Sequence, residues 1–184
     1  MRFVRQSIHD IVLIEPIIHG DERGYFVETF RQDIFEEAIG YKVNFVQDNQ
    51  SKSSKGVLRG HHFQMPPYSQ AKLVTVTEGS VLDISVDIRK SSPTFGKHVS
   101  VELTDVNKHQ IFIPHGFAHG FVVLSDNATF SYKVDNYYAP EFERGIAYDD
   151  ADLAIDWKLA LKDLRLSDKD KAHPLLANSK DLFE

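Results

Sequence analysis

The sequence predicts an all-β fold of the sandwich or barrel type, in a single domain that spans residues 1–184. Two observations lead to this prediction. From Lys42 onward, short alternating or β-branched runs continue for about a hundred residues. Gly, Pro, Asn and Asp separate these runs, as in antiparallel sheets. A chain of this length buries roughly 70% of its unfolded surface in one core, so a second domain is not required.

The segment before this region also reads as β-structure. Phe3–Ile18 mixes β-branched and polar residues and predicts one or two short strands. Gly20–Gly24 has the residue types of a turn, and Tyr25–Phe30 resumes a strand. An arginine inside such a turn, here Arg23, is by local chemistry a solvated side chain.

A short helix is predicted next. Asp33 and Glu36 have the spacing of a capping box. Gly40 follows the last apolar residue and ends the helix. The apolar stripe consists of Ile34, Phe35, Ala38 and Ile39.

The strands of the main region differ in character. Val43–Asn49 ends in a polar triplet, which we interpret as a strand end. Val81–Ile88 alternates cleanly between apolar and polar residues, after a hairpin turn at Glu78–Ser80. Its two faces carry Leu82, Ile84, Val86 and Ile88 on one side, and Asp83, Ser85 and Asp87 on the other. Further strands are expected at Leu73–Val76, Val99–Leu103, Gln110–Ile113, Phe121–Leu124 and Thr129–Val134.

The last part of the chain changes character. Leu153–Leu166 contains the only tryptophan, Trp157, and predicts extended or short helical structure that closes one end of the barrel. Ser167–Asp170 is polar and turn-like. On local chemistry alone, Asp170 would be a solvated turn residue.

Composition excludes several kinds of function. Without cysteine there is no disulfide, thiolate nucleophile or thiolate metal site, and we expect a cytoplasmic protein. Met1–Ile14 contains charged residues and reads neither as a signal peptide nor as a membrane span. A net charge of -6 disfavours nucleic acid and anionic membranes, although local cations can still hold a small anionic ligand.

The stretch Val57–Gln64 concentrates the chemistry, because it sets an arginine and two adjacent histidines between apolar residues. Strand alternation places Arg59 and His61 on one face, and Leu58, His62 and Gln64 on the other. Only one histidine then faces a given pocket, where it could act as a base near neutral pH. The alternative is a surface strand with solvated histidines.

A second cluster at Ile113–Gly120 has the Pro-x-Gly-x-x-His spacing found in the second half of the cupin jelly-roll motif. In metal-binding cupins the first half is His-x-His with a glutamate three or four residues later. Here the two histidines are adjacent and the next glutamate is Glu78, so a complete metal site is not expected. Two alternatives stay open: a metal-dependent cupin enzyme using His61, His62 and His119, and a non-catalytic sugar-binding jelly roll.

Taken together, these motifs resemble the dTDP-4-dehydrorhamnose 3,5-epimerase family over nearly the whole chain. The departures are His61, where the family usually has an apolar residue, and the unusual loop Met65–Tyr68. The matching blocks are Asp21–Phe26, Phe45–Asn49, Leu58–Gln64, Gln70–Lys72, Pro114–Gly120, Tyr132–Lys133 with Tyr137–Pro140, and Ser167–Asp170.

The resemblance implies a double-stranded β-helix, the cupin jelly roll, with an N-terminal strand extension and short C-terminal helices. It also implies an isomerase that inverts C3 and C5 of dTDP-4-dehydro-6-deoxy-D-glucose to give dTDP-4-dehydro-L-rhamnose. Both carbons lie next to the C4 carbonyl, so enolate formation acidifies their hydrogens and no cofactor or metal is needed. A related enzyme that inverts only one centre is the alternative.

The resemblance also assigns catalytic roles. His62 matches the base and Asp170 the carboxylate that orients it, as in a hydrolase triad without its nucleophile. Tyr132 matches the acid, although a core aromatic beside Phe130 is the plain alternative. Lys72 matches the group that stabilises the developing oxyanion.

Substrate-binding residues follow in the same way. Arg23, Arg59 and Lys169 are expected near the diphosphate, since guanidinium groups match phosphate oxygens. The resemblance implies that Arg23, Phe26 and Glu28 reach across from a second subunit, which predicts a homodimer with exchanged N-terminal strands. The remaining expected contacts are stacking by Phe26 and Tyr138, hydrogen bonds from Glu28, Gln47, Asp48 and Asn49, and pocket positions for His119 and Glu143.

Overall fold

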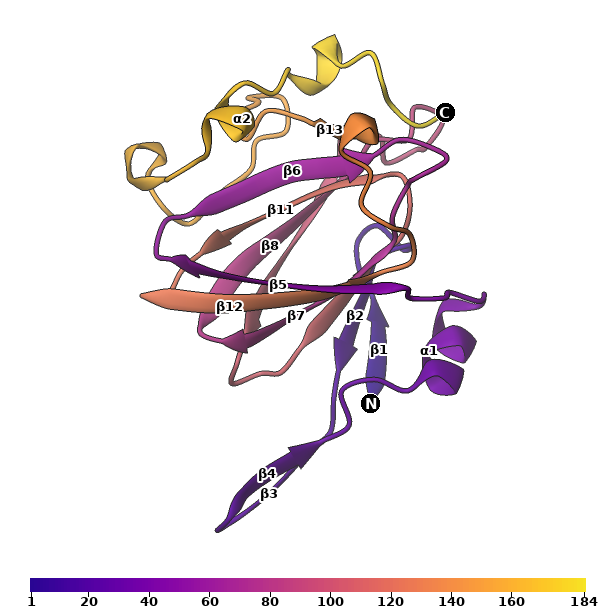
Figure 1. The fold of residues 1–184 in the computed structure, drawn as a ribbon, viewed down its shortest axis with the longest axis vertical. Coiled ribbons are helices and arrows are strands. Elements are labelled where there is room, and N and C mark those ends of the chain that lie inside the picture. Colours follow the sequence, from indigo (N-terminus) through magenta and orange to yellow (C-terminus); the bar gives the residue numbers. More distant parts are fainter.

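A computed structural model describes residues 1–184 and contains two antiparallel sheets that face each other (Figure 1). The all-β jelly-roll prediction is confirmed. None of the helices is long and apolar enough to cross a lipid bilayer. In spatial order, one sheet contains β1 (Arg2–Arg5), β2 (Val12–Glu15), β10 (Gln110–Ile113), β7 (Lys72–Glu78), β12 (Asn127–Val134) and β5 (Gln47–Ser54). The other contains β13 (Glu143–Gly145), β6 (Leu58–Gln64), β11 (Phe117–Val123), β8 (Ser80–Asp87) and β9 (His98–Thr104).

The predicted N-terminal strands form, but not all of them join the body. β1 and β2 pair with each other and extend the six-stranded sheet. β3 (Ile18–Asp21) and β4 (Gly24–Val27) pair only with each other, on either side of the predicted turn. This hairpin, which we call the arm, projects away from both sheets (Figure 1).

The helix α1 (Gln32–Ile39) confirms the predicted element but not its predicted cap. Its N-cap is Arg31, which makes no side-chain capping bond, and Asp33 instead accepts hydrogen bonds from that arginine. Glu36 accepts a hydrogen bond from the backbone of Val43 and so ties the helix to the chain that follows. Gly40 ends the helix in the left-handed conformation (φ 90°), as expected.

The triplet Gln47–Asn49 begins a strand rather than ending one, so that interpretation was wrong. β5 runs from Gln47 to Ser54 and pairs with β12 along its whole length. It lies at the edge of its sheet and one of its faces is exposed. That exposure explains why β5 is almost entirely polar and lacks the apolar alternation of a half-buried strand.

Strand β8 has the predicted alternation, yet both of its faces are buried. The apolar face, including Leu82 and Ile84, packs in a cluster under the C-terminal segment. The polar face, with Asp83 and Ser85, is equally inaccessible to solvent. Buried carboxylates need charged or hydrogen-bonding partners, so this strand marks a polar interior.

The C-terminal segment lies across the outer face of the five-stranded sheet (Figure 1). The expectation that it closes one end of the barrel was therefore wrong. Trp157 is buried there and donates its indole N–H to the Tyr148 carbonyl oxygen at 3.0 Å. The segment contains three short helices, the 3-10 helices η2 (Leu161–Asp163) and η3 (Leu176–Asn178) and the α-helix α2 (Asp168–Lys171). A further 3-10 helix, η1 (Pro140–Phe142), comes directly before β13.

A bulge in β6 overturns the expected side-chain directions. His62 pairs with His119 and Arg59 with Phe121, so two residues on β6, Gly60 and His61, lie opposite one residue on β11, Gly120. The extra residue is Gly60, whose φ is +125° and where a Cβ would lie 2.4 Å from the Gly120 Cα. A bulge shifts the alternation by one residue. Arg59 and His62 therefore face the same cavity.

We predict that Gly60→Ala destabilises the protein more than Gly24→Ala. Both glycines have φ near +130°, and a side chain there costs about 1–3 kcal/mol of strain. Only at Gly60 does the new methyl group overlap another backbone, which adds about 1–3 kcal/mol. Free energies of unfolding in urea measure the difference. Equal losses in the two variants would contradict the close-approach argument.

Candidate active site

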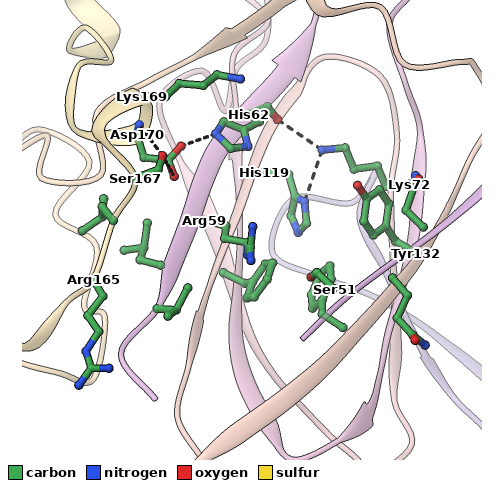
Figure 2. Close-up of a pocket in the computed structure, with 17 residues that line it drawn as sticks. Ser51, Arg59, His62, Lys72, His119, Tyr132, Arg165, Ser167, Lys169 and Asp170 are labelled. Atoms are coloured by element: carbon green, nitrogen blue, oxygen red, sulfur yellow. Dashed lines mark hydrogen bonds and ion pairs between the residues drawn. The ribbon is translucent and has the colours of Figure 1, made fainter. Parts of the chain in front are cut away.

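A cavity of about 660 Å³ opens between the two sheets, and side chains from both sheets and from the C-terminal segment line it (Figure 2). The cavity brings together eight of the predicted site residues: Asn49, Arg59, His62, Lys72, His119, Tyr132, Lys169 and Asp170. They come from six separate elements: the strands β5, β6, β7, β11 and β12, and the helix α2, which supplies the last two residues.

His62 and Asp170 form a hydrogen-bonded pair at the cavity wall, with the His62 Nε2 and Asp170 Oδ1 atoms 2.5 Å apart. Asp170 is 4% exposed, and its second oxygen accepts a hydrogen bond from Ser167 Oγ at 2.9 Å. Burial opposes ionisation, but contacts with His173 and His62 outweigh it and hold the pKa of Asp170 below its usual range. An ionised Asp170 leaves the His62 proton on Nε2 and the Nδ1 lone pair free.

Lys72 and His119 form a second group inside the cavity (Figure 2). The Lys72 ammonium donates to the His62 backbone carbonyl at 3.4 Å and lies 3.5 Å from His119 Nδ1. His119 Nε2 lies 2.8 Å from the fully buried carboxylate of Asp83. Burial lowers the pKa of Lys72 to about 8, while Asp83 acts in the opposite direction. Lys72 is therefore still mainly charged at pH 7.

Tyr132 stands on the sheet opposite His62. It belongs to β12 in the six-stranded sheet, whereas His62 belongs to β6 in the five-stranded sheet. The Tyr132 ring packs beside the Phe130 ring, with centroids 5.9 Å apart, and Tyr132 also lines the cavity. Burial, followed by the nearby Glu143, raises the pKa of Tyr132, so its hydroxyl stays protonated at neutral pH.

Glu143 organises the rim of the site. Its carboxylate pairs with Lys169 and accepts a hydrogen bond from the Tyr138 hydroxyl at 2.7 Å. One of its oxygens lies 4.0 Å from His62 Nδ1. Although burial opposes it, hydrogen bonds from Lys169 and Tyr138 lower the pKa of Glu143. The rim therefore carries a negative charge close to the free nitrogen of His62.

Other predicted binding residues are not at the cavity. Arg23 is on the arm, with its side chain 85% exposed and paired with Asp21. Phe26 is 68% exposed on the same hairpin, and Glu28 follows it. Asp48 pairs with Lys133 at the surface. Gln47 bonds Asn49 and the backbone of Tyr138, so it supports neighbouring residues within the chain.

His61 points away from the cavity. It is fully buried on the outer side of β6, where its ring packs 5.4 Å from that of Trp157. Burial lowers its pKa to about 3, so the ring is neutral. The alternative metal site made of His61, His62 and His119 is therefore not assembled, because the sheet separates the first ring from the other two.

The sequence reasoning missed two functional partners. Asp83 holds His119, and the signal for it was the polar face of an otherwise apolar strand. Ser167 caps α2: its hydroxyl oxygen accepts a hydrogen bond from the Asp170 backbone N–H, and the same hydroxyl lies within hydrogen-bond distance of the Asp170 carboxylate. The Ser-x-x-Asp spacing was visible in the sequence as a capping pattern. Arg165 and Ser51 also line the cavity, and no local pattern pointed to them.

The chain is similar in sequence and fold to known proteins. Residues 5–178 match the family model described as dTDP-4-dehydrorhamnose 3,5-epimerase. A Shigella flexneri protein of that name is 55% identical over 170 residues, which are 92% of this chain and 93% of the relative. A Legionella pneumophila dTDP-6-deoxy-D-glucose-3,5-epimerase, crystallised with dTDP-4-keto-L-rhamnose, has a TM-score of 0.95 and 49% identity over 100% of this chain and 97% of that chain. A 3'-monoepimerase from Streptomyces bikiniensis, in complex with dTDP-quinovose, has a TM-score of 0.86 and 36% identity over 94% and 86% of the two chains.

We predict that Asp170→Asn destabilises the protein at pH 7 and that this deficit is much smaller at pH 2. A carboxylate whose pKa is lower in the folded state contributes its full stability above its ordinary pKa near 4, and this stability is lost as the pH falls through the lower pKa of the folded state. Removing its charge-assisted hydrogen bonds should cost about 1–3 kcal/mol at pH 7. Urea unfolding at the two pH values measures this change.

Asp168→Asn is the matched control, because that carboxylate is fully exposed and pairs with Lys171 on the surface. Exposed pairs contribute little, so the control should track the parent protein at both pH values. A deficit in Asp170→Asn that persists undiminished at pH 2 would show that the ionised carboxylate is not its source.

Proposed function

The chain belongs to the dTDP-4-dehydrorhamnose 3,5-epimerase family, and from this premise we propose how its residues carry out the reaction. It is an isomerase that inverts C3 and C5 of dTDP-4-dehydro-6-deoxy-D-glucose, which gives dTDP-4-dehydro-L-rhamnose. Each inversion removes a hydrogen beside the C4 ketone and returns one to the opposite face of the ring. The site must therefore supply a base, an acid and a partner for the enolate oxygen.

His62 is the proposed base, acting through Nδ1. Asp170 accepts the Nε2 hydrogen and keeps the Nδ1 lone pair directed away from itself. When the ring takes the substrate proton it becomes an imidazolium, and the adjacent carboxylate stabilises that charge. Glu143, 4.0 Å from Nδ1, adds to this stabilisation.

Tyr132 is the proposed acid. The observation that carries the proposal is the position of the two groups: His62 and Tyr132 line one cavity from opposite sheets. A sugar ring held between them has the imidazole on one face and the phenol on the other. Protonation of the carbanion by Tyr132 then inverts the centre. His62 releases the proton that it removed to solvent, and Tyr132 recovers a proton from solvent, which restores both groups for the next inversion.

Lys72 is the proposed partner of the enolate oxygen. Its ammonium is buried, so its attraction for a developing negative charge is screened less than in water. One hydrogen bond to the His62 carbonyl and the contact with His119 hold it in place. Since its pKa is lowered to about 8, this positive charge is lost as the pH rises through that value.

Arg59 and Lys169 are the proposed diphosphate ligands at the cavity mouth. Arg59 bonds Ser53 Oγ through Nε at 3.2 Å, which leaves its terminal nitrogens available. Lys169 lines the same cavity beside Glu143. These cations account for anion binding by a chain whose net charge is -6. Arg165, which also lines the cavity, adds to the positive potential.

The arm supports a proposed homodimer. Ile17, Ile18, Tyr25 and Phe26 are large apolar residues, and each is at least 42% exposed. A two-stranded hairpin is marginally stable by itself in water, so a second copy of the chain is the proposed cover. In such a dimer Arg23, Phe26 and Glu28 would complete the partner's substrate site. We also propose a cytoplasmic location, since a chain without cysteine requires no oxidising compartment.

We predict that Tyr132→Phe separates hydrogen exchange from inversion. With the keto sugar in deuterated water, His62 still removes a proton and returns deuterium to the same face, so deuterium enters while inversion falls at least about 100-fold. Proton NMR reports exchange and stereochemistry at C3 and C5 together. His62→Ala is the control, because without the base deuterium should enter at neither carbon. Inversion at the parent rate by Tyr132→Phe would assign the acid to another residue.

We predict that Arg23→Ala and His62→Ala subunits complement each other. Co-expressed with different tags, they should form mixed dimers in which one site has both its own His62 and its partner's Arg23. Statistical pairing then restores roughly a quarter of the parent's sites. Arg59→Ala co-expressed with His62→Ala is the control, because both residues line the cavity of the same chain. Absence of activity in the first pair would place Arg23 in its own subunit's site or outside any site.

A further inference from the structure

A third side chain with metal-ligand chemistry stands beside the His62–Asp170 pair, and the proposed mechanism does not use it. This residue is His173. The ligand atoms of His62, Asp170 and His173 all lie within 4.8 Å of one another. Two imidazoles and a carboxylate are a donor set that suits divalent transition metals, zinc in particular.

The fold places His173 there by leaving room for its ring. Gly145 on β13 pairs with His62 on β6, and a Cβ at Gly145 would lie 2.4 Å from His173 Nε2. The Ala147 N–H donates to the Pro174 carbonyl at 2.8 Å, which anchors the chain next to the histidine. The His173 ring meets the His62 ring edge-on, with centroids 5.5 Å apart.

The available nitrogen of His173 has no hydrogen-bond partner. Nε2 is buried, and the nearest acceptor is Asp170 Oδ1 at 3.6 Å, too far for a hydrogen bond. The side chain is 11% exposed, so water does not readily compensate. A buried imidazole nitrogen aimed at a carboxylate and another imidazole is what a metal ligand requires before the ion arrives.

The spacing suits a tetrahedral ion. Bonds of about 2.0–2.2 Å to nitrogen and oxygen place neighbouring ligand atoms roughly 3.3 Å apart. His173 and Asp170 are already near this value at 3.6 Å, and His62 and Asp170 must separate from 2.5 Å by less than about 1 Å. Ser167 Oγ holds the other oxygen of Asp170, as outer partners of metal-bound carboxylates do.

We propose that His62, Asp170 and His173 form a binding site for Zn²⁺ or a similar divalent ion, and that its occupation inhibits the enzyme. The ion takes the Nε2 lone pair of His62, so the ring's single proton moves to Nδ1. His62 then has no lone pair facing the substrate and accepts no proton. The binding site rests on the cluster alone, whereas the inhibition rests on the proposed role of His62 as base.

Zinc titration of the full chain tests the site. Isothermal calorimetry should give one Zn²⁺ per chain, and Co²⁺ should give the visible absorption of a tetrahedral ion. Loss of an outer partner already costs 10–100-fold in metal affinity, so loss of a direct ligand in His173→Gln should weaken Zn²⁺ binding by at least about 100-fold. Gly145→Ala, which crowds the ring and keeps the ligand, should also weaken it. Circular dichroism confirms that both variants fold.

His115→Gln is the matched control. His115 Nε2 lies 2.8 Å from Asp135, so it forms a similar histidine–carboxylate pair, but no third ligand accompanies it. This variant should bind Zn²⁺ as the parent does. No stoichiometric binding to the parent, or equal affinity in parent and His173→Gln, would overturn the proposed site.

Inhibition is then measured against each protein's own metal-free rate. Zn²⁺ should inhibit the parent and His115→Gln over the concentration range in which it binds, and His173→Gln only at concentrations about 100-fold higher. If Zn²⁺ binds through His173 but leaves epimerisation unchanged, the site stands, and both the inhibition and the assignment of His62 as base are wrong.

Discussion

The hydrogen bond between His62 and Asp170 joins the two parts of the molecule on which the site depends. His62 belongs to the five-stranded sheet, whereas Asp170 is in α2, in a segment that lies over the outer face of that sheet. Docking that segment through Trp157 and its apolar neighbours brings a carboxylate to the cavity wall. The same contact decides which nitrogen of His62 carries the proton. Packing of this segment on the outer face of the sheet thus fixes the tautomer of His62, which lines the cavity between the sheets.

The interior of this jelly roll is divided between an apolar end and a polar one. Phe117, Phe121 and Phe130 pack with aliphatic residues between the sheets. At the cavity, where Phe121 and Phe130 also line the wall, Lys72 and His119 introduce polar groups, and His119 contacts the buried Asp83 behind it. Burying such groups costs several kcal/mol unless each has a partner. Here the Lys72 ammonium has the His62 carbonyl, and Asp83 has His119 through one oxygen while its other oxygen has no hydrogen-bond partner. The remaining cost of burial is consistent with the proposed role of Lys72, which must stay in place to stabilise a developing enolate.

Seven short motifs in one order were enough to indicate the family, and the cavity brings eight of the predicted site residues together. Local patterns were less reliable where neighbouring chains decide the outcome. Asp33 has a capping spacing, yet Arg31 competes for its carboxylate. Gln47–Asn49 looks like a strand end, yet β12 supplies hydrogen bonds that extend the strand to Ser54. The segment around Trp157 was predicted to close one end of the barrel, yet it packs on the outer face of the five-stranded sheet.

The sequence by itself determined the all-β class, the hairpins at glycines, the helix stop at Gly40 and the residue types needed for acid–base chemistry. These depend on backbone preferences and alternation, which act over a few residues. Only the tertiary structure decided that Arg59 and His62 share a face, that His61 leaves it, and that Asp83 and Ser167 hold the catalytic groups. Those facts depend on a bulge formed against Gly120 and on contacts between residues far apart in the chain, which no local pattern encodes.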